Sequence, residues 1–476
     1  MKMLSTTING ITDSIKPPSN KTITGCFVFL FLGFIIVFSY LTPPFQAPDE
    51  PAHLFRAYQI SQGEIVGKKI NDVASGGGVD VGLFELLNRF DPYIPGGAPP
   101  VDPNLYEAVR AIGWKEQKVN ADFRNTVQYA PFAYAPQAAA LAIGKALGLS
   151  VMDSYVLART FAALTASILA VTAVVMLRTT AASGFILSLL LLPMSVFLIA
   201  STSQDGILLG LGALLAAVVA RSFDREPGRG LWLPYAATAC ITILALARLP
   251  YLALLPLLWM PALWSHGGGR RFTVRLPMVL CTLFVLAAFA GWLVMTEPVR
   301  VKVYPLNDKV VSTTDQLLFL VRNPTFVWHL TLNTLLANLT SYTAGFIGIL
   351  GWLSISLPRW GYRFAMVSLM ATFAAAPPPA NRTTADLALV GLALVLSTGG
   401  VFLAQYLTWT AVGAPVIDGV QGRYFLPIAP LLLILTLPFP ARFAKWRRML
   451  GFAGLLLLLP VCLIAARALF VRFVGQ

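Results

Sequence analysis

Long apolar runs recur along the whole chain and constrain its fold more than any other feature of the sequence. Many extend over roughly 17–25 residues with almost no charge, the length a helix needs to cross the hydrocarbon core of a bilayer. Of the 476 residues, 57% are hydrophobic and only 12% are charged. The alternating segments of about ten residues that are typical of outer-membrane barrels are not evident. The sequence therefore predicts an all-α membrane protein that crosses the bilayer many times.

The excess of positive charge does not indicate a nucleic-acid partner. The formal net charge is +14, but the Lys and Arg residues form no long basic run and fall mostly in short loops. There they keep a loop on the cytoplasmic side. All four cysteines lie in apolar runs, so we interpret them as packing residues and not as a disulfide or metal framework. These are Cys26, Cys240, Cys281 and Cys462.

The first apolar run sets the orientation of the chain. Residues 1–23 carry Lys2, Lys16 and Lys21 and are predicted to be a cytoplasmic N-terminus. The run at 24–41 is predicted to be an uncleaved first span, with a cleaved signal peptide as the alternative. Residues 24–476 then form a single polytopic membrane domain.

Basic loops around 178, 221–229 and 270–275 fix the direction of the later spans if all three are cytoplasmic. This rule predicts about 11 transmembrane helices, with a range of 10 to 13. They are expected near residues 24–41, 154–177, 183–200, 206–220, 232–248, 251–264, 274–296, 361–376, 386–410, 422–439 and 450–472.

Two long segments are predicted to lie outside, at 42–150 and 297–359. The same charge rule makes the apolar stretch 131–149 a juxtamembrane helix and the semi-polar stretch 326–346 a surface-lying helix. If 326–346 crossed instead, the basic loop ARFAKWRR at 441–448 would lie outside. The first segment should hold surface helices at 53–62, 82–90 and 105–114 and a Gly-rich turn, SGGGVD, at 75–80. It is too small for an independent core.

The sequence PDEPAH at 48–53 places two adjacent carboxylates and an imidazole between two prolines, just after the first span. Each proline fixes its own φ and biases the residue before it toward extended geometry, so the turn should be stiff. Pro51 suits the first turn of a helix, with the acids at its electropositive end. A rigid acidic pair at a membrane edge indicates a functional site. The structural alternative is a helix cap paired with Arg56.

Further polar residues near span ends fall on the same predicted side. Independent snorkelling of single side chains would scatter them over both faces. Carboxylates can act as a general base or bind a hard divalent cation, and Arg or Lys can hold a phosphate. The combination suits an enzyme with a lipid-phosphate donor. These residues are Arg159, Gln204, Asp205, Arg248, Lys302, Gln421, Arg423 and Tyr424.

Five motifs carry a resemblance to a bacterial family of multi-pass membrane proteins that bears a domain-of-unknown-function label. They are PDEPAHLFRAYQISQG at 48–63, YAPFAYAPQ at 129–137, STSQD at 201–205, ARLPYLAL at 247–254 and QGRYFLP at 421–427. The organisation also resembles the GT-C membrane glycosyltransferases. That resemblance implies an essential acid in the first outer loop, matched by Asp49 or Glu50, and a later outer acid, matched by Asp205. It also implies sugar transfer from a polyprenyl-phosphate carrier on the outer face.

We therefore expect a glycosyltransferase of the bacterial inner membrane with its site facing the periplasm. Its partners would be the lipid bilayer, a polyprenyl-phosphate-linked sugar and a cell-envelope glycan or lipid-linked acceptor, with no nucleic acid. The alternatives are a lipid-linked glycan flippase or exporter, and a glycan ligase or polymerase. The donor sugar, the acceptor and the oligomeric state are left open.

Each candidate residue has an expected role in this hypothesis. Asp49 is the general base, assisted by Glu50, and these two with His53 could also hold Mg²⁺ or Mn²⁺. Supporting residues beside the carboxylates are His53, Gln204 and Asp205. The donor phosphate is expected to bind Arg159, Arg248, Lys302 and Arg423. The acceptor and the donor are expected to be positioned by Tyr129, Gln421 and Tyr424.

Overall fold

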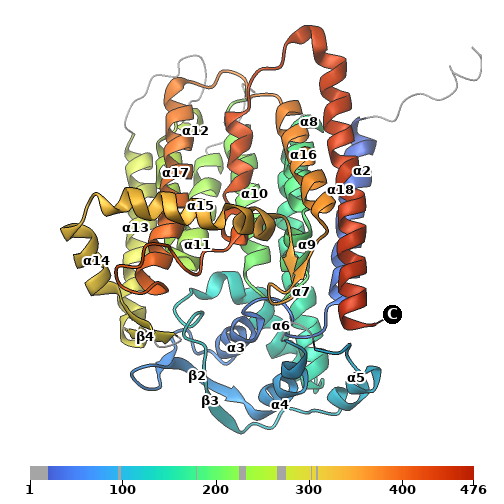
Figure 1. Ribbon diagram of the computed structural model, residues 1–476, viewed down its shortest axis with the longest axis vertical. Coiled ribbons are helices and arrows are strands. Elements are labelled where there is room, and N and C mark those ends of the chain that lie inside the picture. The colour runs from blue at the N-terminus through green and yellow to red at the C-terminus, as the bar shows by residue number, and fades with distance from the viewer. Residues whose placement is uncertain are drawn as a thin grey trace, which may run out of the picture.

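The computed structural model describes residues 20–94, 98–177, 180–224, 232–264, 275–301, 303–306 and 309–475. Its long helices stand side by side as a bundle (Figure 1). The short helices and strands that follow α2 along the chain gather at one end of this bundle, the lower end in Figure 1. We call this assembly, built from residues 42–150, the cap. The segments around 200–204 and 248 also lie at the cap end, where Thr202 contacts Glu50 and Ala130 contacts Leu246.

Within the described ranges, five helices are long and apolar enough to cross a membrane, and a bent pair could form a sixth span. The five are α2 (Asn20–Leu41), α7 (Val151–Met176), α13 (Leu276–Thr296), α17 (Thr384–Thr408) and α18 (Ala444–Phe473), and the pair is α8 (Thr180–Leu190) with α9 (Pro193–Ile199), bent by 69°. The chain is thus a mostly helical protein with several candidate spans. The expected count of about 11 is not confirmed.

The other expected spans are short or irregular, which explains the lower count. Helix α10 (Asp205–Arg221) has 17 residues, α16 (Arg359–Ala375) has 17 and α11 (Trp232–Ala247) has 16. At roughly 1.5 Å per residue, 17 residues reach about 25 Å, less than the ~30 Å of a bilayer core.

Two predicted spans are not regular α-helices. The stretch 251–264 is mostly a 3₁₀-helix, and 422–439 holds two short ones. Prolines lie within both stretches, and each removes an N–H that an α-helix would use. The segments are η3 (Leu249–Trp259), α12 (Pro261–Trp264), η5 (Gly422–Phe425) and η6 (Ala429–Leu435), with η7 (Ala441–Phe443) before α18.

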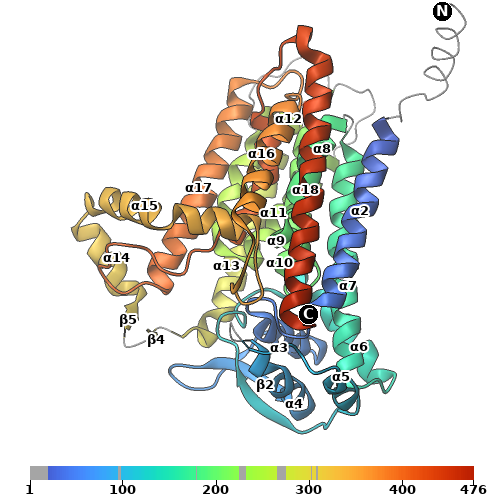
Figure 2. The ribbon, with the colours of Figure 1, turned by 45° about the vertical axis from the view of Figure 1, so that its right-hand side comes forward.

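Helix α15 (Phe326–Ile347) lies across the long helices and not along them, as Figures 1 and 2 show from two directions. It is not among the candidate spans, in keeping with the prediction for 326–346. A β-carbon added at Gly422 would lie 2.0 Å from the Tyr342 carbonyl oxygen and 2.3 Å from the Phe346 nitrogen. The glycine therefore lets η5 sit directly against α15. Between α13 and α15 the chain forms η4 (Glu297–Val299), the hairpin of β4 (Val303–Leu306) with β5 (Lys309–Ser312), and α14 (Thr313–Arg322). The hairpin of β6 (Ile349–Leu350) with β7 (Ile355–Ser356) follows α15.

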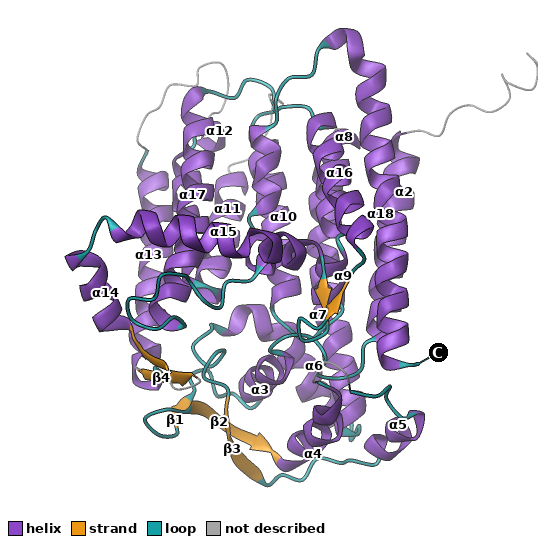
Figure 3. Cartoon of the chain, viewed as in Figure 1, coloured by secondary structure: helices purple, strands orange, loops and turns teal. Residues whose placement is uncertain are grey.

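The cap contains a small antiparallel sheet that the sequence analysis did not predict (Figure 3). The stretch SGGGVD, expected to be a turn, is its central strand, so the all-α expectation was incomplete. A β-carbon at Gly77 would lie 2.6 Å from the Gln59 amide nitrogen, and one at Gly76 would overlap the Ala121 carbonyl. Glycines thus allow this strand to approach both a helix and its neighbour closely. The strand order is β1 (Lys68–Lys69), β2 (Ser75–Asp80) and β3 (Lys118–Asp122), with Gly76 opposite Asp122.

The helices of the cap follow the sequence pattern closely. They are α3 (Glu50–Ser61), α4 (Val81–Phe90), η1 (Asp91–Tyr93), α5 (Pro103–Arg110), η2 (Pro131–Tyr134) and α6 (Ala135–Ala146). One continuous hydrophobic core runs from the bundle into the cap and includes Leu54 and Leu83 of the cap. Because this core is shared, α3 is held firmly against the bundle.

Candidate functional site

Asp49 lies immediately before α3 in a left-handed backbone conformation, with φ 63° and ψ 7°. Few residues with a β-carbon adopt this conformation, and Asp is among those that tolerate it. The side chain makes no capping hydrogen bond to α3 within the described structure. Its Oδ2 lies 2.7 Å from Nη2 of Arg423, and its Oδ1 accepts a hydrogen bond from Asn125 at 3.2 Å. The helix-cap alternative therefore does not account for this carboxylate.

The other half of that alternative, pairing with Arg56, also fails. The Arg56 guanidinium is buried and donates to the side chain of Gln59 and to the carbonyls of Ile65 and Tyr129. Arg56 thus ties α3 to the following loop and to the segment before η2. The Asp49 carboxylate is left free to face a different set of groups.

Four charged side chains form an alternating chain at the junction of cap and bundle. Arg423 lies between two acids, with Nη2 2.7 Å from Asp49 and Nη1 3.5 Å from Asp205. Asp205 also pairs with Nη2 of Arg248 at 2.5 Å. The two acids and two arginines balance in charge. Because these four side chains are largely shielded from water, the charge of each one must be balanced by its neighbours.

Each member of this chain comes from a different segment. Asp49 precedes α3, Asp205 begins α10, Arg248 follows α11, and Arg423 lies in η5. All four segments lie at the cap end of the bundle. The structure therefore brings together residues that are up to 374 positions apart in the sequence.

Arg248 has unused hydrogen-bonding capacity. Its guanidinium lies over the ring of Tyr424, 4.6 Å from the centroid. Its Nε is buried and has no hydrogen-bond partner among the described residues. A buried donor left unpaired costs about 1–3 kcal/mol, so a ligand oxygen here would be favourable. The adjoining space is too narrow for a water molecule and is lined by Leu198, Asp205, Leu209, Arg248, Tyr251, Arg423, Tyr424, Leu426 and Pro427.

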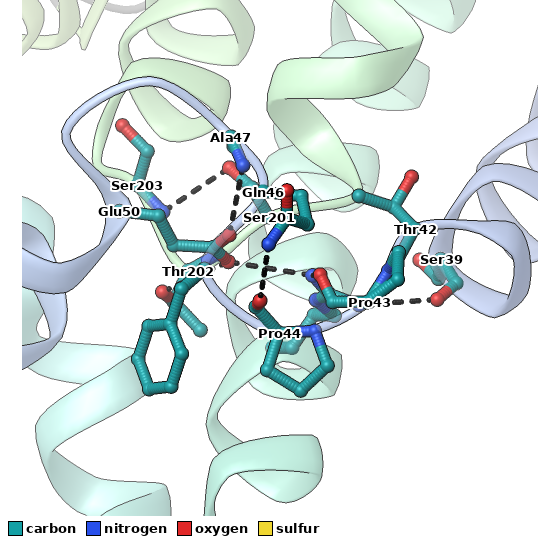
Figure 4. Close-up of polar contacts among 12 residues, drawn as sticks. Ser39, Thr42, Pro43, Pro44, Gln46, Ala47, Glu50, Ser201, Thr202 and Ser203 are labelled. Atoms are coloured by element: carbon teal, nitrogen blue, oxygen red, sulfur yellow. Dashed lines mark hydrogen bonds and ion pairs between the residues drawn. The ribbon is translucent and has the colours of Figure 1, made fainter. Parts of the chain in front are cut away.

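Glu50, although adjacent to Asp49, occupies a different environment (Figure 4). Its side chain is completely buried, with 0% exposed. One carboxylate oxygen accepts from the Tyr155 hydroxyl and the Thr202 amide, each at 2.9 Å, and pairs with Arg159 at 3.4 Å. The other accepts from the Ala47 amide at 3.1 Å. Both carboxylate oxygens are thus occupied by contacts within the fold, and the expected catalytic assistance from Glu50 stays a prediction.

Arg159 pairs with Glu50 and is not one of the four alternating charges that include Asp49. It donates to the carbonyls of Ser39, Thr42 and Pro43, at the end of the first span. The Glu50–Arg159 pair thus ties α2, α3, α7 and the loop before α10 together. Its expected role at a donor phosphate stays a prediction.

His53 is buried on α3 with Nδ1 2.7 Å from the Tyr134 hydroxyl. Burial lowers the pKa of His53 to about 4, outweighing the opposite effect of Asp205 and Asp49. Burial raises the pKa of Tyr134, so its hydroxyl stays protonated. The geometry therefore fits a neutral imidazole whose Nδ1 accepts a hydrogen bond from the Tyr134 hydroxyl.

The His53 environment predicts acid sensitivity. The folded-state pKa of about 4 lies below the ordinary 6.5, so the unfolded chain binds more protons between these values. Stability should be fully present above pH 6.5 and fall by about 3 kcal/mol toward pH 4. His53→Gln removes this proton uptake. We expect the melting temperature in detergent to drop less between pH 7.5 and 5 for His53→Gln than for the wild type. Equal drops would contradict the prediction.

The remaining candidates are distributed around the two arginines. Gln421 accepts from Nε of Arg423 at 2.7 Å, which orients that guanidinium. The Tyr424 ring contacts both arginines, and Tyr129 contributes its carbonyl to Arg56. Gln204 is fully buried, and neither amide atom has a partner in the part of the chain described. Lys302 lies outside the described residues.

Two neighbours of Asp49 were missed by the sequence analysis. Asn125 follows β3 and bonds to Asp49, and Trp352 from the β6–β7 loop lines, together with Asp49 and Asn125, a pocket on the cap side of the site. Neither lies in one of the five motifs that carry the family resemblance. Only the folding of the cap against the bundle brings them to Asp49.

The expected metal ligands are not assembled. No group of three or more His, Cys, Asp or Glu side chains within the described ranges could hold a metal ion. Glu50 faces Arg159, and His53 faces Tyr134, so neither joins Asp49. As they are placed, these residues do not fit a metal.

Comparison with known proteins gives one match. The model of a family described as "Predicted membrane protein (DUF2142)" matches residues 30–432. The matched range includes Asp49, Asp205, Arg248 and Arg423. No curated protein and no solved structure matches the chain.

Proposed function

This chain belongs to the DUF2142 family of predicted membrane proteins, and we propose that it is a GT-C-type membrane glycosyltransferase. It moves a sugar from a polyprenyl-phosphate donor to a cell-envelope glycan or lipid-linked acceptor. The site faces the periplasm from the bacterial inner membrane. The observation that carries the proposal is the row of four alternating charges formed by Asp49, Arg423, Asp205 and Arg248. At one end of this row stands a partly exposed carboxylate, that of Asp49.

The two arginines supply the phosphate-binding part. Guanidinium groups match phosphate oxygens in a two-pronged geometry, and Arg248 has a buried Nε that needs an acceptor. A donor phosphate would share Arg248 and Arg423 with Asp205 once the side chains around the narrow space beside Arg248 move apart, because that space does not admit a water molecule as it stands. Asp205 then keeps the arginines in place before the donor arrives and balances their charge.

Asp49 supplies the base. Its side chain is 37% exposed, whereas the Arg423 side chain with which it pairs is fully buried. In the reaction, the acceptor hydroxyl oxygen bonds to the anomeric carbon while its proton passes to the Asp49 carboxylate. The bond from the anomeric carbon to the phosphate oxygen breaks, and its electron pair leaves with the polyprenyl phosphate. The arginines stabilise the charge that develops on that phosphate.

The rival class is a lipid-linked glycan flippase or exporter. A transporter of this kind would carry charges along a path through the bundle and use broken helices in paired halves. The four charges of this site instead cluster at the cap end. A glycan ligase or polymerase would use the same chemistry. The identity of the donor that is cleaved distinguishes it from a transferase.

The test uses purified protein in lipid nanodiscs with a panel of polyprenyl-phosphate sugars and periplasmic glycan fractions. We expect one donor to release polyprenyl phosphate and to label an acceptor. The same protein in sealed vesicles separates the rival class. Translocation of an intact lipid-linked glycan, with cleavage of no donor, would overturn the proposal.

A further inference from the structure

A pocket of about 280 Å³ opens beside Asp49 on the cap side. We propose that it binds an uncharged sugar ring of the acceptor, while the donor phosphate binds separately on the arginine side. This assignment rests on the proposed function, because it names the acceptor for that same site. Its lining residues are Asp49, Pro51, Ala52, Phe55, Phe84, Leu87, Ala121, Asp122, Asn125 and Trp352.

The polar groups of the pocket argue against an anionic ligand. They are two carboxylates, Asp49 and Asp122, and the Asn125 amide, and no Lys, Arg or His is among the described lining residues. Both acids are already ion-paired, Asp49 with Arg423 and Asp122 with Arg124, so a phosphate here would meet carboxylate oxygens and no cation among the described lining residues. Sugar hydroxyls, in contrast, can donate to carboxylate oxygens and accept from an amide.

The apolar groups of the pocket are suited to a ring. Phe55 and Phe84 pack with their centroids 5.0 Å apart and form one wall. The Trp352 indole N–H donates to the Phe45 carbonyl at 2.8 Å, which fixes the orientation of its ring. The carbon faces of a sugar ring pack on aromatic rings through C–H contacts, so a fixed indole is a suitable platform.

Asp49 lies at the boundary between this pocket and the arginine side. Its Oδ1 is bonded to Asn125, a lining residue of the pocket. Its Oδ2 is bonded to Arg423, a lining residue of the narrow space beside Arg248. An acceptor hydroxyl in the pocket would therefore meet the base that stands next to the phosphate-binding arginines. Asp49 thus stands between the acceptor pocket and the arginine side.

The volume sets a further limit. Pockets for small molecules begin at roughly 300 Å³, so this one suits a single sugar unit better than a long oligosaccharide. Further units would extend into the solvent over the cap. We therefore expect the terminal unit of a neutral glycan to carry most of the affinity.

The test measures acceptor binding alone, by calorimetry with the full chain in nanodiscs and without donor. The probes are neutral mono- and oligosaccharides, their phosphorylated and uronic-acid counterparts, and inorganic phosphate. We expect neutral sugars to bind and their anionic counterparts to bind at least tenfold more weakly. Trp352→Leu should weaken neutral-sugar binding about tenfold, and Trp352→Phe, which keeps an aromatic face, should retain most of it.

Trp328→Leu is the matched control, because Trp328 is an exposed tryptophan of α15 outside the pocket lining. Tighter binding of the anionic sugars, or equal effects of Trp328→Leu and Trp352→Leu, would overturn the assignment. The two proposals fail separately. If neutral sugars bind in a way that depends on Trp352 but no donor is cleaved, the transferase proposal is wrong and the sugar-pocket proposal stands. If a donor is cleaved but sugar binding is insensitive to Trp352→Leu, the sugar-pocket proposal is wrong and the transferase proposal stands.

Discussion

Replacing Asp49 by Asn is expected to lower the transfer rate about 10²–10⁴-fold while leaving the protein folded. The substitution removes the group that accepts the hydroxyl proton. Asn tolerates the left-handed backbone at this position. Its amide oxygen can accept from Arg423, and its NH₂ group can donate to the side-chain oxygen of Asn125 once that amide is flipped. Arg423 also retains Asp205, so its charge stays compensated.

The measurement is the rate of polyprenyl-phosphate release and of acceptor labelling in nanodiscs, with the melting temperature taken on the same preparations. Asp72→Asn is the matched control, because Asp72 is a fully exposed carboxylate of the cap that pairs with Lys69. It should leave both quantities unchanged. A rate for Asp49→Asn within threefold of the wild type would remove Asp49 from the chemistry.

Replacing the neighbouring Glu50 by Ala should have the opposite phenotype, a loss of folded protein. The Arg159 charge is buried with Glu50 as its ion-pair partner, and removing one member of such a pair costs about 3–5 kcal/mol. The Thr202 amide and Tyr155 hydroxyl also lose their acceptor. Since a typical domain has about 5–15 kcal/mol of stability, this loss should sharply reduce yield and melting temperature.

Two further variants make the Glu50 prediction specific. Glu64→Ala removes a more exposed carboxylate whose nearest partner, Lys118, is 3.9 Å away, and it should cost less than about 1 kcal/mol. Replacing Glu50 and Arg159 together by Gln and Met should recover part of the stability lost in Glu50→Ala, because no buried charge is left unpaired. A double variant as unstable as the sum of its parts would contradict this explanation.

Local sequence patterns were sufficient to predict the helices of the cap. The prolines at 48 and 51 predicted a turn followed by a helix, and α3 begins at Glu50. Apolar periodicity and length predicted the long helices, because a bilayer-spanning helix must satisfy its own backbone and present apolar side chains. The same reasoning failed for 75–80, where glycines act through close contacts with β3 and α3 that no local pattern reveals.

The number of spans was harder to predict for a related reason. Hydropathy shows that a stretch is apolar, but it does not show whether the stretch forms one long helix. The segments near 251–264 and 422–439 are as apolar as the long helices, yet they are wound mainly as 3₁₀ turns between prolines. Such segments are stable in a bundle only where neighbouring helices cover their backbone.

The sequence by itself predicted an acidic turn after the first apolar run, and it placed Asp205, Arg248 and Arg423 near the ends of expected spans on one side. Charge in the loops and the parity of the expected spans are sufficient for such a prediction, since they depend only on order along the chain. The structure brings these residues together at the junction of cap and bundle. The tertiary structure alone decided the roles of Asp49 and Glu50. Adjacent residues at a helix start point in different directions, so Asp49 meets Arg423 and Glu50 meets Arg159. Those partners lie 374 and 109 positions away, and only the packing of the cap on the bundle brings them into contact.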